Sequence, residues 1–247
     1  MLTARDWGFC TIIGVSGTSA PFFLIHWAEL HVESGPAAIL MAMVPLFTII
    51  LAHFISVNEK ITATKVGGIL VGLAGIVVLM GLDSLTGLGD RLWAQLAATS
   101  AALLYALGNA SVRFVGHLPM SLLGAAVMTC ATVFAGGFAL VEAPWSIQPS
   151  WGSIIAMASS SLIGTAAGYY VFFYLILATG PTFVALNNYI IPILGVVWGV
   201  VFLAEEPASM ALAALMLILA GITITNSGLR RERRLNAVLD RHEDRSR

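Results

Sequence analysis

The chain has 247 residues, of which 58% are hydrophobic and only 10% are charged, and its net charge at pH 7 is −1. A water-soluble domain carries roughly a quarter charged residues, so this chain lacks the charge to cover a surface in water. The composition therefore excludes a soluble globular domain and indicates a polytopic membrane protein. Both cysteines, Cys10 and Cys130, fall within apolar segments and are interpreted as small hydrophobic residues, with no disulfide or metal pair.

Apolar segments long enough to cross a bilayer recur along the whole chain. A helix needs about 20 apolar residues to span the hydrocarbon core. The pattern predicts an all-α protein with eight spans, joined by polar connections too short to form a soluble domain. The predicted spans are 7–28, 35–57, 66–82, 92–113, 120–142, 153–177, 182–203 and 208–228. Residues 229–247 are polar and are expected to form a charged cytoplasmic tail.

Two stretches of the chain repeat each other around a proline within a long apolar helix. Pro45 and Pro192 stand at an offset of 147, and each is followed fourteen residues on by a glutamate, Glu59 or Glu206. A glycine- and alanine-rich apolar stretch follows each glutamate. Five predicted crossings separate the copies, an odd number, so the copies are expected to lie upside down relative to one another. Inverted repeats with corresponding interrupted helices are typical of secondary transporters, which alternate access by exchanging the conformations of the two copies.

The basic residues predict the orientation of these spans. If both termini are cytoplasmic, eleven of the twelve lysines and arginines lie on the cytoplasmic side and Arg91 alone lies outside. The positive-inside rule therefore favours cytoplasmic N- and C-termini. We expect a multi-pass protein of the cell (inner or plasma) membrane.

The stretch from Trp27 to Gly75 holds an aromatic–alanine pair, Trp27–Ala28, then Pro45, then Glu59, then the run GGILVGLAGIVVL. The second copy holds YYVFFYLILATGPTF, IIPILGVVWGVVFLAEEP and LMLILAGITI. In order and spacing these motifs resemble the EamA-type repeat of the drug/metabolite transporter superfamily, over most of residues 7–228. The resemblance implies a carrier that exports or exchanges small metabolites or drug-like compounds.

The chain departs from that family pattern at its beginning. The resemblance implies ten helices, five per repeat, whereas the predicted spans form an incomplete inverted repeat of three and five. Residues 1–82 would be the partial first repeat and residues 92–228 the second. An upstream start, a fragment, or a short form that completes its cavity as a homodimer are the alternatives.

Candidate substrate-contacting groups lie near the middle of the predicted membrane. A proline cannot donate to the carbonyl group four residues back, so Pro45 is expected to free the carbonyl of Met41 and Pro192 that of Asn188. Such backbone is tolerated where protein or a water-filled cavity satisfies it, and an amide in lipid is costly unless buried. The hypothesis is a polar cavity; the alternative is a kink that only shapes packing. The candidate lining residues are Met41, Pro45, Tyr105, Asn109, Tyr169, Tyr170, Asn187, Asn188, Pro192 and Trp198.

Glycines and titratable groups offer fewer functional signals. Gly68, Gly72 and Gly75 recur on one apolar helix and are expected to allow close helix contact, without chemistry. His26 and Glu29 are three residues apart near the outer end of the first span, so they share a helical face. They are a candidate proton-coupling pair or, alternatively, an interfacial pair in contact with solvent.

The sequence holds no motif for catalysis, a metal or a cofactor. Its five histidines are scattered, and no HExxH, paired aspartate or glycine-rich phosphate loop occurs. A transporter is therefore favoured over an integral membrane enzyme, with a non-transporting membrane subunit or an inactive fragment as the alternative. The expected partners are the lipid bilayer and a small-molecule substrate, with no nucleic acid. A cavity of amide, hydroxyl and aromatic groups suits neutral or zwitterionic metabolites and amphipathic drugs.

Overall fold

The computed structural model describes residues 2–32, 34–55, 60–85, 91–141, 149–203 and 210–246, without the side chains of residues 233–246 and a few scattered others. Within these residues all regular secondary structure is helical, as predicted. Six of the described helices are long and apolar enough to cross a membrane, and a shorter apolar helix covers Pro181–Leu194. The chain is therefore an all-α polytopic membrane protein. Glu59 and Glu206, the glutamates of the repeat, lie outside the described residues.

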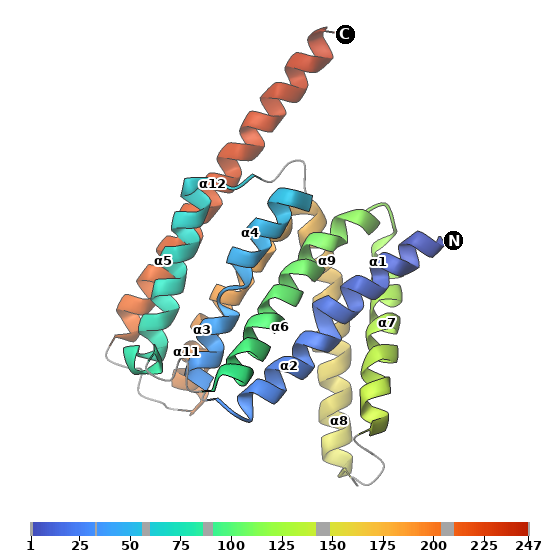
Figure 1. The fold of residues 1–247 in the computed structure, drawn as a ribbon, viewed down its shortest axis with the longest axis vertical. Helices are drawn as coiled ribbons and strands as arrows, with labels where there is room; N and C mark the ends of the chain where they lie inside the picture. Colours follow the sequence, from blue (N-terminus) through green and yellow to red (C-terminus); the bar gives the residue numbers. More distant parts are fainter. Residues whose placement is uncertain are drawn as a thin grey trace.

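The first part of the chain makes three successive helical passages through the molecule, of which the first runs obliquely in Figure 1. The first passage contains a π-helical segment, the second is broken, and the third is a single helix. They are formed by α1 (Ala4–Gly14), η1 (Val15–Ser19) and α2 (Ala20–Glu29); by α3 (Ser34–Met41) and α4 (Val44–Ile55); and by α5 (Ala63–Met80), after which a short 3-10 turn, η2 (Leu82–Leu85), follows.

The rest of the chain makes five further passages within the described residues. The sixth passage again contains a π-helical segment, and the seventh is again broken. These passages are formed by α6 (Leu92–Ser111) with η3 (Val112–Val115); by α7 (Met120–Val141); by α8 (Trp151–Ser159), η5 (Ser160–Ala167) and α9 (Gly168–Thr179); by α10 (Pro181–Ala185) and α11 (Asn187–Leu203); and by α12 (Ala211–Ser246).

The break in the seventh passage lies earlier than the sequence predicts. The second passage is interrupted just before Pro45, as expected, whereas α11 continues through Pro192 and the seventh passage is interrupted at Leu186. Here the Tyr189 amide bonds to the Leu186 carbonyl three residues back, at 2.9 Å. The fully buried Tyr189 hydroxyl also donates to the Ile69 carbonyl of α5 at 2.8 Å. The break therefore falls where α11 is anchored to α5.

Helices α5 and α12 pack side by side and antiparallel along one edge of the molecule (Figure 1). A Cβ atom built on Gly68 would lie 2.5 Å from the backbone nitrogen of Thr225, and one built on Gly72 would lie 2.4 Å from the Tyr189 ring. A Cβ atom built on Gly75 would lie 2.8 Å from the backbone nitrogen of Ile218 of α12. The predicted role of these glycines in close helix contact is confirmed, because a larger residue would push the helices apart.

Helix α6 runs through the middle of the bundle and contacts α2, α3 and α4. Small residues let these helices approach closely. A Cβ atom built on Gly108 would lie 2.6 Å from the Cα of Gly17, so the two backbones touch there. The next residue, Asn109, is carried into the interior, where its side chain is only 5% exposed. The other small residues buried on α6 are Ala94, Ala98, Ala101, Ala102, Ala106, Ala110 and Ser111.

A buried ion pair joins the start of α5 to the outer part of α12. The Lys65 ammonium, which is fully buried, donates to the Glu232 carboxylate and to the Lys60 carbonyl, the latter at 2.8 Å. The Lys60 backbone N–H donates to the second Glu232 oxygen at 2.6 Å. Leu229 is also buried. The first turn of the predicted tail therefore packs against protein, and the helix continues beyond it to Ser246.

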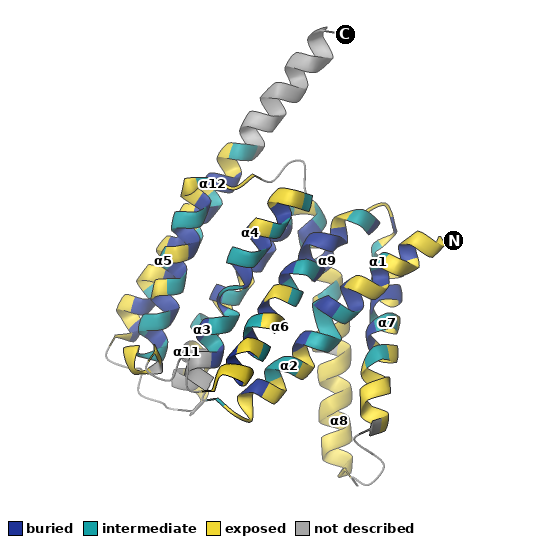
Figure 2. Ribbon diagram, viewed as in Figure 1, coloured by how far each residue is buried: buried dark blue, intermediate teal, exposed yellow. Residues whose placement is uncertain are grey.

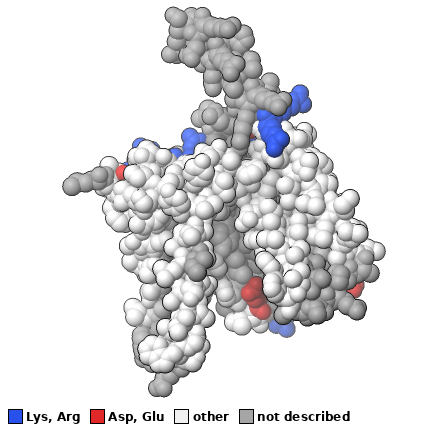
Figure 3. Space-filling model, turned by 180° about the vertical axis from the view of Figure 1, so that it is seen from behind, with Lys and Arg blue, Asp and Glu red and all other residues white. Residues whose placement is uncertain are grey.

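Basic side chains gather at the end of the molecule from which α12 protrudes, and the surface between the two ends carries few charges (Figure 3). At this basic end the Arg113 guanidinium donates to the carbonyl of Ile55. His117 lies 3.1 Å from the Asp6 carboxylate of α1. With the Lys65–Glu232 ion pair, these contacts bring the ends of α1, α4, α5, η3 and α12 together. The helices therefore place at one end the segments that the sequence predicts to lie on one side of the membrane.

Candidate functional site

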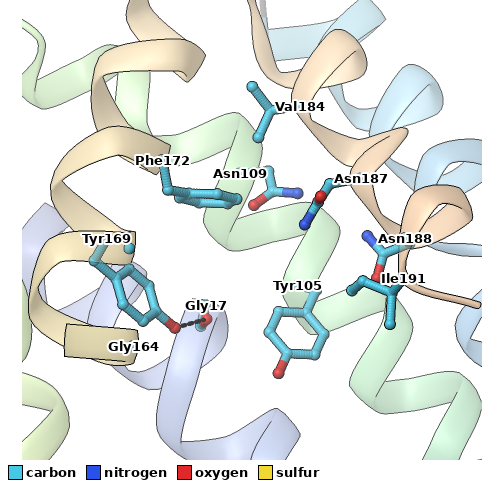
Figure 4. Close-up of a pocket in the computed structure, with 11 residues that line it drawn as sticks. Gly17, Tyr105, Asn109, Gly164, Tyr169, Phe172, Val184, Asn187, Asn188 and Ile191 are labelled. Atoms are coloured by element: carbon cyan, nitrogen blue, oxygen red, sulfur yellow. Dashed lines mark hydrogen bonds between the residues drawn. The ribbon is translucent and has the colours of Figure 1, made fainter. Parts of the chain in front are cut away.

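A cavity of about 310 Å³ lies where the first, fourth, sixth and seventh passages meet (Figure 4). Its walls come from η1, α6, η5, α9, α10 and α11, so both copies of the repeat contribute to it. None of its lining residues carries a formal charge. They are Gly17, Tyr105, Asn109, Gly164, Gly168, Tyr169, Phe172, Val184, Asn187, Asn188 and Ile191. We refer to this space as the polar cavity.

The Asn109 side chain is the most deeply buried amide of the polar cavity. It is 5% exposed, and its amide group points toward Asn187 across the cavity (Figure 4). Among the described residues no hydrogen bond to the protein satisfies this amide. Its polar atoms are accessible from the cavity, since Thr48 Oγ1 is the one fully buried side-chain polar atom without a hydrogen-bond partner among the described residues. A bound molecule or water in the cavity can therefore hydrogen-bond to this amide.

Three further polar groups offer unused hydrogen-bonding capacity to the same space. Asn188 donates through Nδ2 to the Ala185 carbonyl at 3.0 Å, which leaves its side-chain oxygen available. The Asn187 amide and the Tyr105 hydroxyl have no protein partner among the described residues. With Asn109, these groups provide both donors and acceptors and no formal charge. This set of groups matches a neutral or zwitterionic ligand better than an ion of one sign.

Tyr169 has a different role, because the protein already satisfies its hydroxyl. The hydroxyl lies 2.9 Å from Thr18 Oγ1 and donates to the Gly17 carbonyl at 3.3 Å (Figure 4). It therefore ties α9 to η1 across one wall of the polar cavity. The ring packs against Phe172 and Phe173, at centroid distances of 5.9 and 5.7 Å. The Tyr169 and Phe172 rings form an aromatic wall of the cavity, and Phe173 supports them from the core.

The structure brings together half of the predicted lining residues. Tyr105, Asn109, Tyr169, Asn187 and Asn188 all line the polar cavity. Their convergence requires α6, α9 and α11 to meet, which spacing along the chain could not establish. Whether each binds substrate stays a prediction.

The other predicted lining residues lie elsewhere in the structure. Met41 packs in a small cluster around Val44, beside the buried Pro45 and close to the Tyr105 ring. Tyr170 lies on the sixth passage, and Pro192 and Trp198 lie on the seventh. Pro192 is half-buried within α11, whereas Tyr170 and Trp198 are 53% and 55% exposed on the outer surface.

The candidate coupling residues His26 and Glu29 also lie away from the polar cavity. Both are exposed on α2, and His26 Nδ1 lies 2.6 Å from the Phe22 carbonyl oxygen. Neither residue lines the cavity. Their position agrees with the alternative of an interfacial pair, and a role in proton coupling stays a prediction.

Gly17 and Gly164 line the polar cavity, and sequence reasoning missed both. They stand at the same offset of 147 as the two prolines, and each is followed by a threonine, Thr18 or Thr165. Each Gly–Thr pair lies in a π-helical segment, η1 or η5. Such segments inside α-helices frequently occur at functional sites. The repeated Gly–Thr pair is the sequence signal that would have identified these positions.

The fold and the uncharged cavity at its centre define a polytopic membrane protein with an internal polar cavity. The arrangement is similar to that of a solved crystal structure, with a TM-score of 0.76 at 20% identity over 94% of this chain and 78% of that chain. The EamA-like transporter family model matches residues 1–81 and 91–227. The chain therefore belongs to the EamA-like transporter family and is a membrane transporter.

Named relatives are similar over most of the chain. The "Probable terminal-alkyne amino-acid exporter" of Streptantibioticus cattleyicolor is 26% identical, over 93% of this chain and 77% of that protein. An "Uncharacterized transporter" of Archaeoglobus fulgidus is 26% identical, over 86% of this chain and 75% of that one. The "Uncharacterized inner membrane transporter YedA" of Escherichia coli K12 is 24% identical, over 80% and 63%.

Proposed function

We propose that this transporter carries small neutral or zwitterionic compounds through the polar cavity by alternating access. The observation that carries the proposal is the buried Asn109 amide, which faces the cavity without a protein partner among the described residues. A group placed in this way gains a hydrogen bond only when the cavity is occupied. The repeated π-helical Gly–Thr segments, which both line the polar cavity, support movement of η1 and η5 as equivalent parts.

The name of the Streptantibioticus relative adds to this proposal. That protein is named as an exporter of an amino acid with a terminal alkyne, which combines a zwitterionic head with an apolar tail. The cavity here offers uncharged donors and acceptors beside aromatic rings. We therefore propose amino acids and related zwitterions as the first substrates to test.

The proposal is tested by removing the cavity amides one at a time. Each lost hydrogen bond to the substrate is worth about 0.5–1.5 kcal/mol, so Asn109→Ala and Asn188→Ala should each weaken transport roughly 2- to 12-fold. Transport is measured as uptake of radiolabelled amino acids into proteoliposomes that contain equal amounts of purified protein. Membrane abundance of each variant is measured in parallel.

Asn226→Ala is the matched control, because it removes an amide from α12 at a position that does not line the polar cavity. It should leave transport unchanged. Equal losses of abundance and transport in Asn109→Ala would assign that residue to packing. Unchanged transport would remove it from the site.

We also propose that the basic end faces the cytoplasm, with both termini on that side. The support is the gathering of Lys60, Lys65 and Arg113 with the start of α1 and the outer part of α12 at one end. Basic segments are retained in the cytoplasm. A phosphatase or fluorescent reporter fused after Arg247 should report a cytoplasmic position. A periplasmic signal would overturn both the orientation and the direction assigned to the repeat.

A further inference from the structure

A second space of about 290 Å³ adjoins the polar cavity, and its character is different. It lies between α9 and the α10–α11 break, with α12 contributing Ile222. Apart from the wall that it shares with the polar cavity, its lining is hydrocarbon. The side chains that line this space alone are Val171, Leu175, Phe183, Leu186, Ile190 and Ile222. We refer to it as the apolar groove.

The polar cavity and the apolar groove share one wall. Gly168, Phe172, Val184 and Asn187 line both spaces. Gly168 leaves this wall open, because a Cβ atom built on it would meet nothing within 4 Å. The Asn187 amide stands at the boundary, with no protein partner among the described residues. One ligand can therefore occupy both spaces, with its polar part toward the asparagines and its apolar part toward Val171.

We propose that the apolar groove binds the apolar tail of the transported compound, while the polar cavity binds its neutral or zwitterionic head. This inference rests on the proposed function and specifies its substrate class as amphipathic compounds with one tail. A cavity of about 150 Å³ lined by apolar side chains holds one benzene ring. The apolar groove, at about 290 Å³, has room for a tail of roughly twelve carbon atoms on that scale.

An acyl chain of a bilayer lipid is the competing occupant, and the structure favours the substrate tail. The inner wall of the groove is the wall that it shares with the polar cavity, so a chain that fills the groove reaches the Asn187 amide. A lipid with its head group at the membrane surface would place its apolar chain end there. It would leave both Asn187 and Asn109 unpaired, whereas a head group in the polar cavity would satisfy them.

Val171→Trp tests the proposal by shortening the groove. Val171 is 54% exposed on α9, so a larger side chain can be accommodated without a clash in the core. The probes are straight-chain α-amino acids from alanine to 2-aminododecanoic acid. Each buried methylene contributes about 0.8 kcal/mol, which is roughly fourfold in affinity. The wild type should therefore bind progressively longer tails more tightly until the groove is full.

The Val171→Trp variant should reach that limit several carbons earlier and bind alanine as the wild type does. Tyr174→Trp is the control, since Tyr174 is equally exposed on α9 and lines neither space. It should leave the length profile unchanged. If Val171→Trp folds poorly, Phe183→Ala enlarges the groove instead and should move the limit to longer tails.

Binding is measured by thermal stabilisation of the purified protein in detergent, and flux is measured separately in proteoliposomes. The proposal is overturned if Val171→Trp and Phe183→Ala leave the dependence of affinity on tail length unchanged. An equal loss of affinity for every tail length, or a change confined to the amount of co-purified phospholipid, also overturns it. Length-dependent binding without any flux would support the two-part site and contradict the proposed transport function, so the two failures are distinguishable.

Discussion

The first and sixth passages are repeats of one another, yet their surroundings differ (Figure 2). Each carries a π-helical Gly–Thr segment at the equivalent position. In the most apolar 18-residue stretch of the first passage 28% of the residues are buried, compared with 12% in that of the sixth passage. The α8 helix is exposed on all sides in Figure 2. Similar local sequence therefore produces similar helices, while the neighbours of each helix decide its burial.

Helices α6 and α7 account for much of this difference. They pack against α1, η1 and α2. Gly14 allows α7 to approach, because a Cβ atom built on it would lie 2.6 Å from the Val127 carbonyl oxygen. The equivalent residue of the sixth passage is Ser161, which is exposed. The repeat thus has small residues at both positions, and only one of them is used for close packing among the described residues.

A second difference between the copies lies at the two ends of α5 and α12. At the basic end Lys65 and Glu232 form a buried ion pair. Their equivalents at an offset of 147 are Leu212 and Leu85, both exposed at the opposite end. Of these two equivalent pairs of positions, Lys65 and Glu232 are charged and paired, whereas Leu85 and Leu212 carry no charge.

The largest effect is expected from Gly14→Leu. Its side chain would overlap the α7 backbone, which cannot move away as a flexible side chain could, and overpacking of this kind typically costs 1–3 kcal/mol or more. We expect little folded protein in the membrane, measured by detergent-solubilised yield and size-exclusion profile. Ser161→Leu should give normal yield. Similar losses in both variants would show that the two passages are packed alike.

Glu232→Gln should have the next largest effect. The substitution removes the counter-charge of Lys65, which would be left buried with neutral acceptors only, the Lys60 carbonyl and the new amide oxygen. The cost should therefore fall below the roughly 3–5 kcal/mol that complete removal of a buried partner causes. The melting temperature in detergent should fall clearly, although the protein should still insert. Arg231→Gln, an exposed neighbour on α12, should melt as the wild type does. An unchanged melting temperature in Glu232→Gln would contradict the role assigned to the ion pair.

Gly164→Ala should affect transport and leave folding intact. An added Cβ would meet only the Ser160 hydroxyl, at 3.8 Å, so it fits without strain while it narrows the polar cavity. Proteoliposome flux should fall a few-fold at unchanged abundance. Gly124→Ala, where a Cβ meets nothing within 4 Å, is the control outside the cavity. Unchanged flux in Gly164→Ala would argue against movement of substrate past η5.

The smallest effect is expected from Ser161→Cys, which adds a label without changing function. Ser159, Ser160 and Ser161 are exposed together on the sixth passage, and a run of three hydroxyls is a face that protein or water would satisfy better than lipid. We expect the cysteine to react with a water-soluble maleimide or to form a disulfide with a second copy. Labelling only by a lipid-soluble reagent would show that this face contacts the bilayer.

Composition and local pattern determined the helical architecture, because each span must bury its own backbone hydrogen bonds and cover itself with apolar side chains. The break before Pro45 and the close packing at the glycines of α5 were likewise readable, since proline and glycine act on the backbone where they stand. The break at Leu186 was not, because Tyr189 sets it by reaching across to α5. The convergence of Asn109 with Asn187 and the burial of Lys65 depend equally on which helices become neighbours. Those contacts join residues far apart in the chain, and only helix packing in three dimensions decides them.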